Sequence, residues 1–138
     1  MQSIRFSWTN NNPICTKQYP IPHTLRDVVK SEVDEMCHMG VIEISESPYS
    51  SPLLLVKKKD GTNRPVVDFC QINKVTVFDA EPMPRTEDIY AKLAKAHNFS
   101  TLDFIKGYWQ IPMANEDCEK TAFSTPFGLF HFVCMPFG

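Results

Sequence analysis

The feature that most constrains the fold is a pair of strand-like runs separated by a short polar turn. The runs "LLLVKKK" and "RPVVDF" flank "DGTN" within residues 53–69. Branched and aromatic side chains favour strands, and Asp followed by Gly favours the tight turn of a hairpin. The pattern therefore predicts an antiparallel β-hairpin at these residues.

Two segments have the apolar spacing of helices. Thr24 is expected to cap the first helix with Asp27 as its capping-box-like partner, and Gly40 is expected to end it. Thr86 is expected to cap the second helix, which ends near Ala96. The first helix carries an apolar stripe that is expected to face the core: Leu25, Val28, Val29, Val33, Met36 and Met39.

Short extended runs complete the chain. Residues 41–44 ("VIEI") predict a strand, and residues 99–103 ("FSTLD") predict a buried strand that ends at Asp103. A second hairpin is expected from "TAFST" and "LFHFVCM", after one helical turn at "NEDCEK". Helices and strands mix without regular βαβ alternation, so the predicted class is α+β. Residues 1–22 are expected to form an extended lead-in, and the sequence assigns no role to residues 1–16.

Charge is unevenly distributed along the chain. The net charge of −2 gives no global reason to expect a polyanionic partner. Residues 24–47 are mainly acidic, whereas residues 53–77 are mainly basic. An acidic helix is therefore expected beside a basic segment, and any contact with nucleic acid would depend on that segment.

The five cysteines are scattered, odd in number and without a C-x-x-C pair. This pattern favours reduced, buried thiols in an intracellular protein over a disulfide framework. The adjacent Cys37 and His38 lack a second pair at zinc-ligand spacing, so ordinary packing is favoured for them. No apolar run approaches the ~18 residues of a membrane span, and no signal peptide is evident. We expect a cytoplasmic or nuclear protein that is not secreted.

Asp103 and the basic hairpin each allow two interpretations. A carboxylate at a strand end suits a hard divalent cation, but on spacing alone an aspartate that caps the turn at Ile105–Gly107 is favoured. Lys57–Lys59 and Arg64 suit phosphate groups, which Arg64 would grip in a bidentate manner. In a generic protein, the same charges would keep the hairpin soluble and protect its edge from pairing.

Three long runs, in one order, resemble the reverse transcriptase of long-terminal-repeat retroelements of the Ty3/gypsy type. They are "SSPLLLVKKKDGTNRPVVDFCQINKVT", "MPRTEDIYAKLAKAHNFSTLDFIKGYWQIPM" and "KTAFSTPFGLFHFVCMPFG", and the likeness extends from Lys17 to Gly138. The resemblance implies part of a right-hand polymerase fold. The fingers would span residues of about 17–80 and 114–138, and the palm would begin at about 81–113, within one interleaved unit.

The resemblance also implies roles for individual residues. Asp103 matches the first catalytic aspartate, which binds Mg²⁺. Tyr108 matches the residue that rejects a 2′-hydroxyl by steric clash. The residues implied to bind the incoming nucleotide are Lys58, Arg64, Phe104, Ile105, Tyr108 and Phe137. Those implied to support the template are Asp68, Phe69 and Gly138.

The implied activity is RNA-directed DNA synthesis with Mg²⁺, deoxynucleoside triphosphates and an RNA or DNA template–primer. The family also needs a Tyr-x-Asp-Asp motif, and these 138 residues contain no Asp-Asp dipeptide. We therefore expect the chain alone to be inactive and marginally stable, as one part of a longer polyprotein. The alternatives are a non-catalytic nucleic-acid or nucleotide binder that uses the basic hairpin, an inert translated relic, and a second chain that supplies the missing aspartates.

Overall fold

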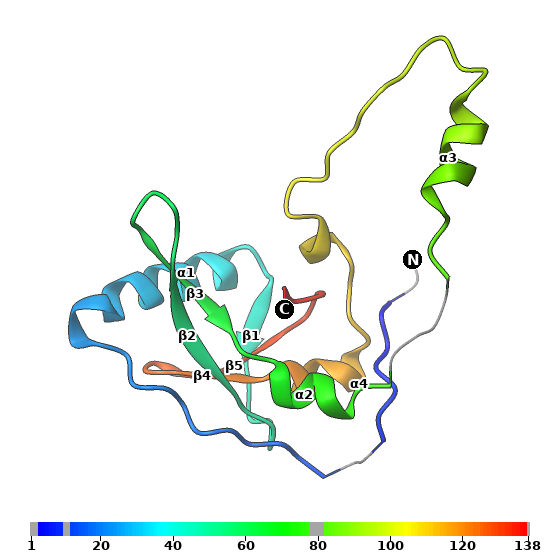
Figure 1. Ribbon diagram of the computed structural model, residues 1–138. Helices are drawn as coiled ribbons and strands as arrows, with labels where there is room; N and C mark the ends of the chain where they lie inside the picture. The colour runs from blue at the N-terminus through cyan, green and yellow to red at the C-terminus, as the bar shows by residue number, and fades with distance from the viewer. Residues whose placement is uncertain (1–2, 10–11, 78–81, 138) are drawn as a thin grey trace.

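A five-stranded sheet forms the centre of the molecule, which the computed structural model describes at residues 3–9, 12–77 and 82–137 (Figure 1). The strand order is β1-β5-β4-β2-β3. Adjacent strands are antiparallel, except that β2 and β4 pair in parallel through Ser51 and Pro52. The bounds are β1 Ile42–Ile44, β2 Ser51–Lys57, β3 Asn63–Val67, β4 Phe123–Thr125 and β5 Gly128–Phe132. Together with the helices, this mixed sheet confirms the α+β class.

Helix α1 (Arg26–His38) covers the sheet and contacts β1 and β3. Its apolar stripe is only partly confirmed, because Val29, Val33 and Met36 are buried whereas Met39 is 41% exposed. The helix ends as predicted: Gly40 has a φ of +66°, and the Val41 N–H donates to the Met36 carbonyl at 3.0 Å.

The predicted cap of α1 is wrong. Thr24 lies within a short 3₁₀ turn, His23–Leu25, and Leu25 precedes the first helical residue without a side-chain cap. The Leu25 N–H donates to the Pro22 carbonyl at 3.0 Å. The turn therefore begins before Thr24, which leaves this threonine inside it instead of at the boundary.

The basic hairpin is confirmed as β2 and β3, with Leu53 opposite Val67 and Lys57 opposite Asn63. A short helix that the sequence did not predict, α2 (Cys70–Val75), follows β3 directly. Its six residues are too few to show helical periodicity. The Cys70 N–H donates to Asp68 Oδ1 at 2.9 Å and thereby fixes the start of α2.

Residues 82–111, which we call the arm, extend away from the sheet in Figure 1. Its helix α3 (Thr86–Leu93) follows Arg85 without a side-chain cap, so the predicted Thr86 cap is wrong and the helix ends before Ala96. The predicted buried strand at 99–103 is also wrong: this segment has no ladder partner in the described part of the chain, and Leu102 is 89% exposed. A strand needs a neighbouring edge for its backbone groups, and none of the described strands offers one here.

The chain returns to the sheet through a turn, a helix and the second hairpin. The 3₁₀ turn η2 (Gly107–Gln110) precedes α4 (Asn115–Cys118) and the 3₁₀ turn η3 (Glu119–Thr121), which confirms a helical turn at "NEDCEK". β4 and β5 confirm the second hairpin, with Thr125 opposite Gly128.

The cysteines are only partly as expected. All five are free, and Cys118 and Cys134 are buried, but Cys15 and Cys70 are exposed. Among the described residues, no helix has the length and apolar character that crossing a membrane requires.

Candidate functional site

Lys58 and Arg64 project from the same face of the basic hairpin. Arg64 pairs directly with Val56, and Lys58 follows Val56 by two residues, so strand alternation puts both cations on one side. The Lys58 N–H donates to the Thr62 carbonyl at 2.7 Å and closes the turn, in which Gly61 has a φ of +85°. Neither cation forms an ion pair with any residue that the structure describes.

The turn contains one acidic side chain, Asp60. Its Oδ1 accepts hydrogen bonds from the Thr62 hydroxyl at 2.6 Å and from the Thr62 N–H at 2.9 Å. These bonds hold the pKa of Asp60 below its usual range, with a smaller contribution from the charge of Lys58. Asp60 thus uses its charge to stabilise the turn, while Lys58 and Arg64 remain available to a ligand.

A first hollow of about 420 Å³ lies beneath these two cations. Its charged residues are Lys58, Arg64 and Glu32 of α1, which confirms that the acidic helix lies beside the basic segment. Its lining is otherwise largely apolar and includes Met36, Leu53, Val67, Trp109, Phe132 and Phe137.

A second, wider hollow of about 590 Å³ lies against the returning part of the arm. Asp103, Phe104 and Tyr108 line it together with Phe137. Phe137 belongs to both hollows, and its ring packs edge-on against Tyr108 at 5.1 Å and Trp109 at 5.6 Å between centroids. The two hollows therefore meet at Phe137 and together make up the candidate site.

This arrangement brings together most of the residues expected to bind a nucleotide. Lys58 and Arg64 line the first hollow, Asp103, Phe104 and Tyr108 line the second, and Phe137 lines both. Ile105 lines neither: its side chain is 83% exposed, and its carbonyl accepts a hydrogen bond from Gln110 Nε2 at 2.8 Å.

The sequence did not indicate that Lys106 anchors this site. Its Nζ lies 3.5 Å from Glu35 Oε1 of α1 and 4.6 Å from the centre of the Trp109 ring. Its φ of +50° is the left-handed conformation that a lysine rarely adopts. Lys106 thereby connects the loop that carries Asp103 to α1. Lys106 and Glu35 are 71 positions apart in the sequence, so no local sequence pattern could indicate their contact.

The residues expected to support a template lie elsewhere. Asp68 accepts hydrogen bonds from the Cys70 N–H at 2.9 Å and the Tyr19 hydroxyl at 3.1 Å. Hydrogen bonding, first to Cys70 and then to Tyr19, holds the pKa of Asp68 below its usual range. Phe69 is 5% exposed and packs edge-on against Phe132 in the core. Gly138 lies outside the described residues.

At the expected Mg²⁺ site, the described residues place one carboxylate. Asp103 is exposed and stands as a single carboxylate, and nowhere in residues 3–9, 12–77 and 82–137 do three metal-ligating side chains gather. Mg²⁺ commonly binds through one or two carboxylates together with water and phosphate oxygens. Asp103 can supply one such ligand, but this donor set does not define a metal centre by itself.

Comparison with known proteins agrees with the geometry. A family profile described as "Reverse transcriptase (RNA-dependent DNA polymerase)" matches residues 56–138. The chain is 43% identical to the Retrovirus-related Pol polyprotein from transposon 297 of Drosophila melanogaster, over 94% of this chain and 13% of that protein. It is 41% identical to the corresponding polyprotein from transposon gypsy, over 94% of this chain and 13% of that protein.

Two proteins with lower sequence identity to this chain also come from a transposon and a foamy virus. The Transposon Tf2-3 polyprotein of Schizosaccharomyces pombe is 32% identical over 88% of this chain and 9% of its own length. The crystal structure of the Prototype Foamy Virus Protease-Reverse Transcriptase superposes with a TM-score of 0.75 at 27% identity, over 93% of this chain and 17% of that chain. The chain thus spans only 9–13% of these curated relatives.

Proposed function

The chain belongs to the reverse transcriptase family and is similar to Ty3/gypsy-type retrotransposon polyproteins, and from this premise we propose that it holds the incoming deoxynucleoside triphosphate during template-directed DNA synthesis. The observation that carries the proposal is the junction of the two hollows at Phe137. Lys58 and Arg64 line the first hollow on one side of this junction. Asp103 and Tyr108 line the second hollow on the other side.

Lys58 and Arg64 are the proposed phosphate ligands. A triphosphate has several negative oxygens, and Arg64 can hold two of them in a bidentate manner while Lys58 acts as a point charge. Neither side chain needs to break an ion pair with a described residue before it binds phosphate. Glu32 also lines the first hollow, where its carboxylate would oppose phosphate oxygens placed close to it.

Tyr108 is the proposed selector of the sugar. Its ring lines the second hollow and packs edge-on against Phe137, a contact that limits how far the ring can turn away. A deoxyribose would fit against this ring, whereas the 2′-oxygen of a ribose would collide with it. Phe104 and Ile105 would contribute backbone N–H groups to the triphosphate.

Asp103 is the proposed ligand for Mg²⁺. In phosphoryl transfer, bound Mg²⁺ neutralises phosphate charge and orients the reacting groups. The described residues offer one carboxylate at the site, and the 138 residues contain no Asp-Asp pair. We expect this chain to bind nucleotide without extending a primer by itself.

The proposed setting is a longer polyprotein that binds an RNA or DNA template–primer. Phe69 would support the template indirectly, from the core beneath the hairpin, and Asp68 would do so from the start of α2. The proposed domain division remains fingers at about 17–80 and 114–138 and the start of the palm at about 81–113. Because the reaction consumes nucleoside triphosphates, its place would be the cytoplasm or the nucleus.

A second candidate function is nucleic-acid binding without chemistry. Lys57, Lys58 and Lys59 are exposed together at the end of the basic hairpin, where a phosphate backbone could contact them. Such binding would weaken steeply with salt, because it depends on counterion release.

The test is fluorescence anisotropy of a labelled deoxynucleoside triphosphate titrated with the purified chain. Lys58→Ala and Arg64→Ala should each weaken binding about tenfold, which corresponds to one lost charged hydrogen bond. Lys92→Ala, on α3 and in neither hollow, is the matched control and should leave binding unchanged. Equal weakening by all three variants would contradict the proposed phosphate site.

A further inference from the structure

Residues 3–9, "SIRFSWT", form a segment that we call the strap. Ile4, Phe6 and Trp8 are half-buried, and the residues between and beside them are exposed. This alternation is that of a strand with one face on the protein. The strap lies outside the matched family region, which begins at residue 56.

One end of the strap joins the point at which the arm returns to the sheet. The Ile4 N–H donates to the Pro112 carbonyl at 3.0 Å, and the Ala114 N–H donates to the Ile4 carbonyl at 2.9 Å. In Figure 1 this dark-blue segment runs beside α4 and the base of the arm.

The other end of the strap joins the segment that precedes the arm. The Val77 N–H donates to the Ser7 carbonyl at 2.8 Å, and the Thr9 N–H donates to the Val75 carbonyl at 3.1 Å. A continuous segment thus connects the two places where the arm leaves and rejoins the body, although these places are 35 residues apart in sequence between Val77 and Pro112.

A buried carboxylate holds the middle of the strap. Asp117 is 3% exposed, and its Oδ2 accepts a hydrogen bond from the Phe6 N–H at 2.9 Å. Its Oδ1 pairs with Lys120, whose Nζ lies 4.9 Å from the centre of the Trp8 ring. Since a buried charge is costly without partners, the strap and Asp117 depend on one another.

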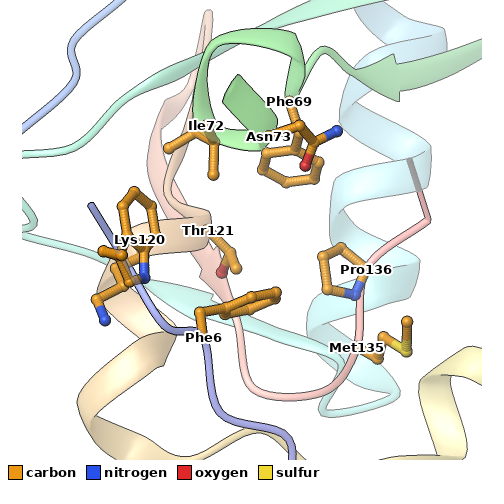
Figure 2. A pocket seen from close by; sticks show the side chains of 9 residues that line it. Phe6, Phe69, Ile72, Asn73, Lys120, Thr121, Met135 and Pro136 are labelled. Atoms are coloured by element: carbon orange, nitrogen blue, oxygen red, sulfur yellow. The ribbon is translucent and has the colours of Figure 1, made fainter. Parts of the chain in front are cut away.

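The strap also packs beneath the end of the chain that supplies Phe137. Phe6 and Trp8 line a small cavity of about 70 Å³ together with Met135 and Pro136. Figure 2 shows Phe6 across this cavity from Ile72 and Phe69, with Pro136 and Met135 at its side. The Met135 N–H donates to the Ile111 carbonyl at 2.9 Å, so this segment is itself joined to the arm.

We infer that Phe6 and Asp117 are positioning residues, through which the strap fixes the base of the arm and the segment before Phe137 relative to the body of the protein. The strap thereby sets the spacing between Asp103 and Tyr108 on the arm and Lys58 and Arg64 on the hairpin. The use of this spacing in nucleotide binding rests on the proposed function, but the restraint itself does not.

Amide hydrogen exchange of the full chain, read by mass spectrometry, tests the restraint. Phe6→Ala should speed amide exchange roughly tenfold in residues 111–114 and 133–137. The substitution removes packing that opposes local opening of these two segments. Arg5→Ala is the matched control: Arg5 is the outward neighbour, and it has an exposed contact to Glu116 at 3.7 Å. It should change nothing, and Phe6→Leu should restore most of the protection. Protection that is unchanged, or that is lost equally in β2 and β3, would overturn the inference.

Nucleotide binding by the same variants separates this inference from the proposed function. Phe6→Ala should weaken the affinity for a labelled deoxynucleoside triphosphate several-fold, whereas Arg5→Ala should not. Local loss of protection with no nucleotide binding by any of the proteins, the unmodified chain included, would leave the strap established and refute the proposed function. Unchanged affinity in Phe6→Ala, with binding by the unmodified chain, would refute the positioning role.

Discussion

The side-chain amide of Gln18 forms two hydrogen bonds with the backbone of Leu53. Gln18 Oε1 accepts from the Leu53 N–H at 2.8 Å, and Gln18 Nε2 donates to the Leu53 carbonyl at 2.6 Å. The pairing of β2 with β4 covers only Ser51 and Pro52, so Gln18 takes the place of a neighbouring strand at the next residue. It thereby steadies the base of the hairpin that carries Lys58 and Arg64.

We predict that Gln18→Ala lowers the free energy of unfolding by about 1–3 kcal/mol, because two backbone groups of the buried Leu53 lose their partners. Urea denaturation measures the change. Gln71→Ala, on the exposed side of α2, is the control and should alter the free energy of unfolding little. Similar midpoints for Gln18→Ala and the unmodified chain would show that water replaces the amide without cost.

Replacing Lys106 should affect the site more than the stability. Its contact with Glu35 is largely exposed, so Lys106→Met should change the free energy of unfolding by no more than about 1 kcal/mol. The loss of the cation over Trp109 should nevertheless shift the tryptophan emission, measured in a Trp8→Phe background where Trp109 is the sole tryptophan. Lys92→Met should leave the emission unchanged, and an identical spectrum for Lys106→Met would argue against a fixed Lys106–Trp109 contact.

Acid should weaken the protein partly through Asp68. Because its hydrogen bonds lower the pKa of Asp68 in the folded state, its contribution to stability is present above the unfolded pKa of about 4 and is lost as the pH falls through the folded pKa. Asp68→Asn should therefore flatten the dependence of stability on pH below about pH 4. Thermal melts across this range measure the slope, with Glu46→Gln, at an exposed position after β1, as control. If Asp68→Asn has the same slope as the unmodified chain, the lowered pKa of Asp68 does not contribute to the loss of stability in acid.

Millimolar Mg²⁺ should not stabilise the chain by itself. A ligand raises the melting temperature only if it binds the folded state, and Asp103 offers a single carboxylate at the site. Melting curves with and without MgCl₂, matched in ionic strength with NaCl, should superimpose. A rise that Asp103→Asn abolishes would reveal further ligands and would refute the incomplete donor set.

The parts of the fold that could be predicted are those whose causes lie close together in sequence. The basic hairpin follows from its turn residues, and α1 follows from its apolar spacing and Gly40. The segment 99–103 was misassigned because its apolar composition resembles a strand, whereas strand formation depends on a distant edge. The strap has a strand-like alternation, but its partners lie more than 60 residues away in sequence, so no local signal assigned it a place.

The residues of the candidate site likewise fall into those that could be predicted from the sequence and those that depend on contacts between distant segments. The resemblance to reverse transcriptases implied Lys58, Arg64, Asp103, Phe104, Ile105, Tyr108 and Phe137, and the structure brings all of them except Ile105 to the two adjoining hollows. Lys106, Trp109 and Glu32 were missed, because their importance comes from contacts between segments and not from residue type. The template role implied for Phe69 stays a prediction, and its burial in the core allows it only indirect support.

The most direct test of the account compares the affinities for a deoxynucleoside and a ribonucleoside triphosphate in two variants. If the two hollows form one nucleotide site, Arg64→Ala should weaken both affinities equally, because both ligands carry the same triphosphate. Tyr108→Ala should instead remove the preference for the deoxynucleotide while it leaves the triphosphate contacts in place. A preference that survives Tyr108→Ala, or an unmodified chain that does not distinguish the two sugars, would contradict the central claim that Phe137 joins a phosphate-binding side to a sugar-selecting side.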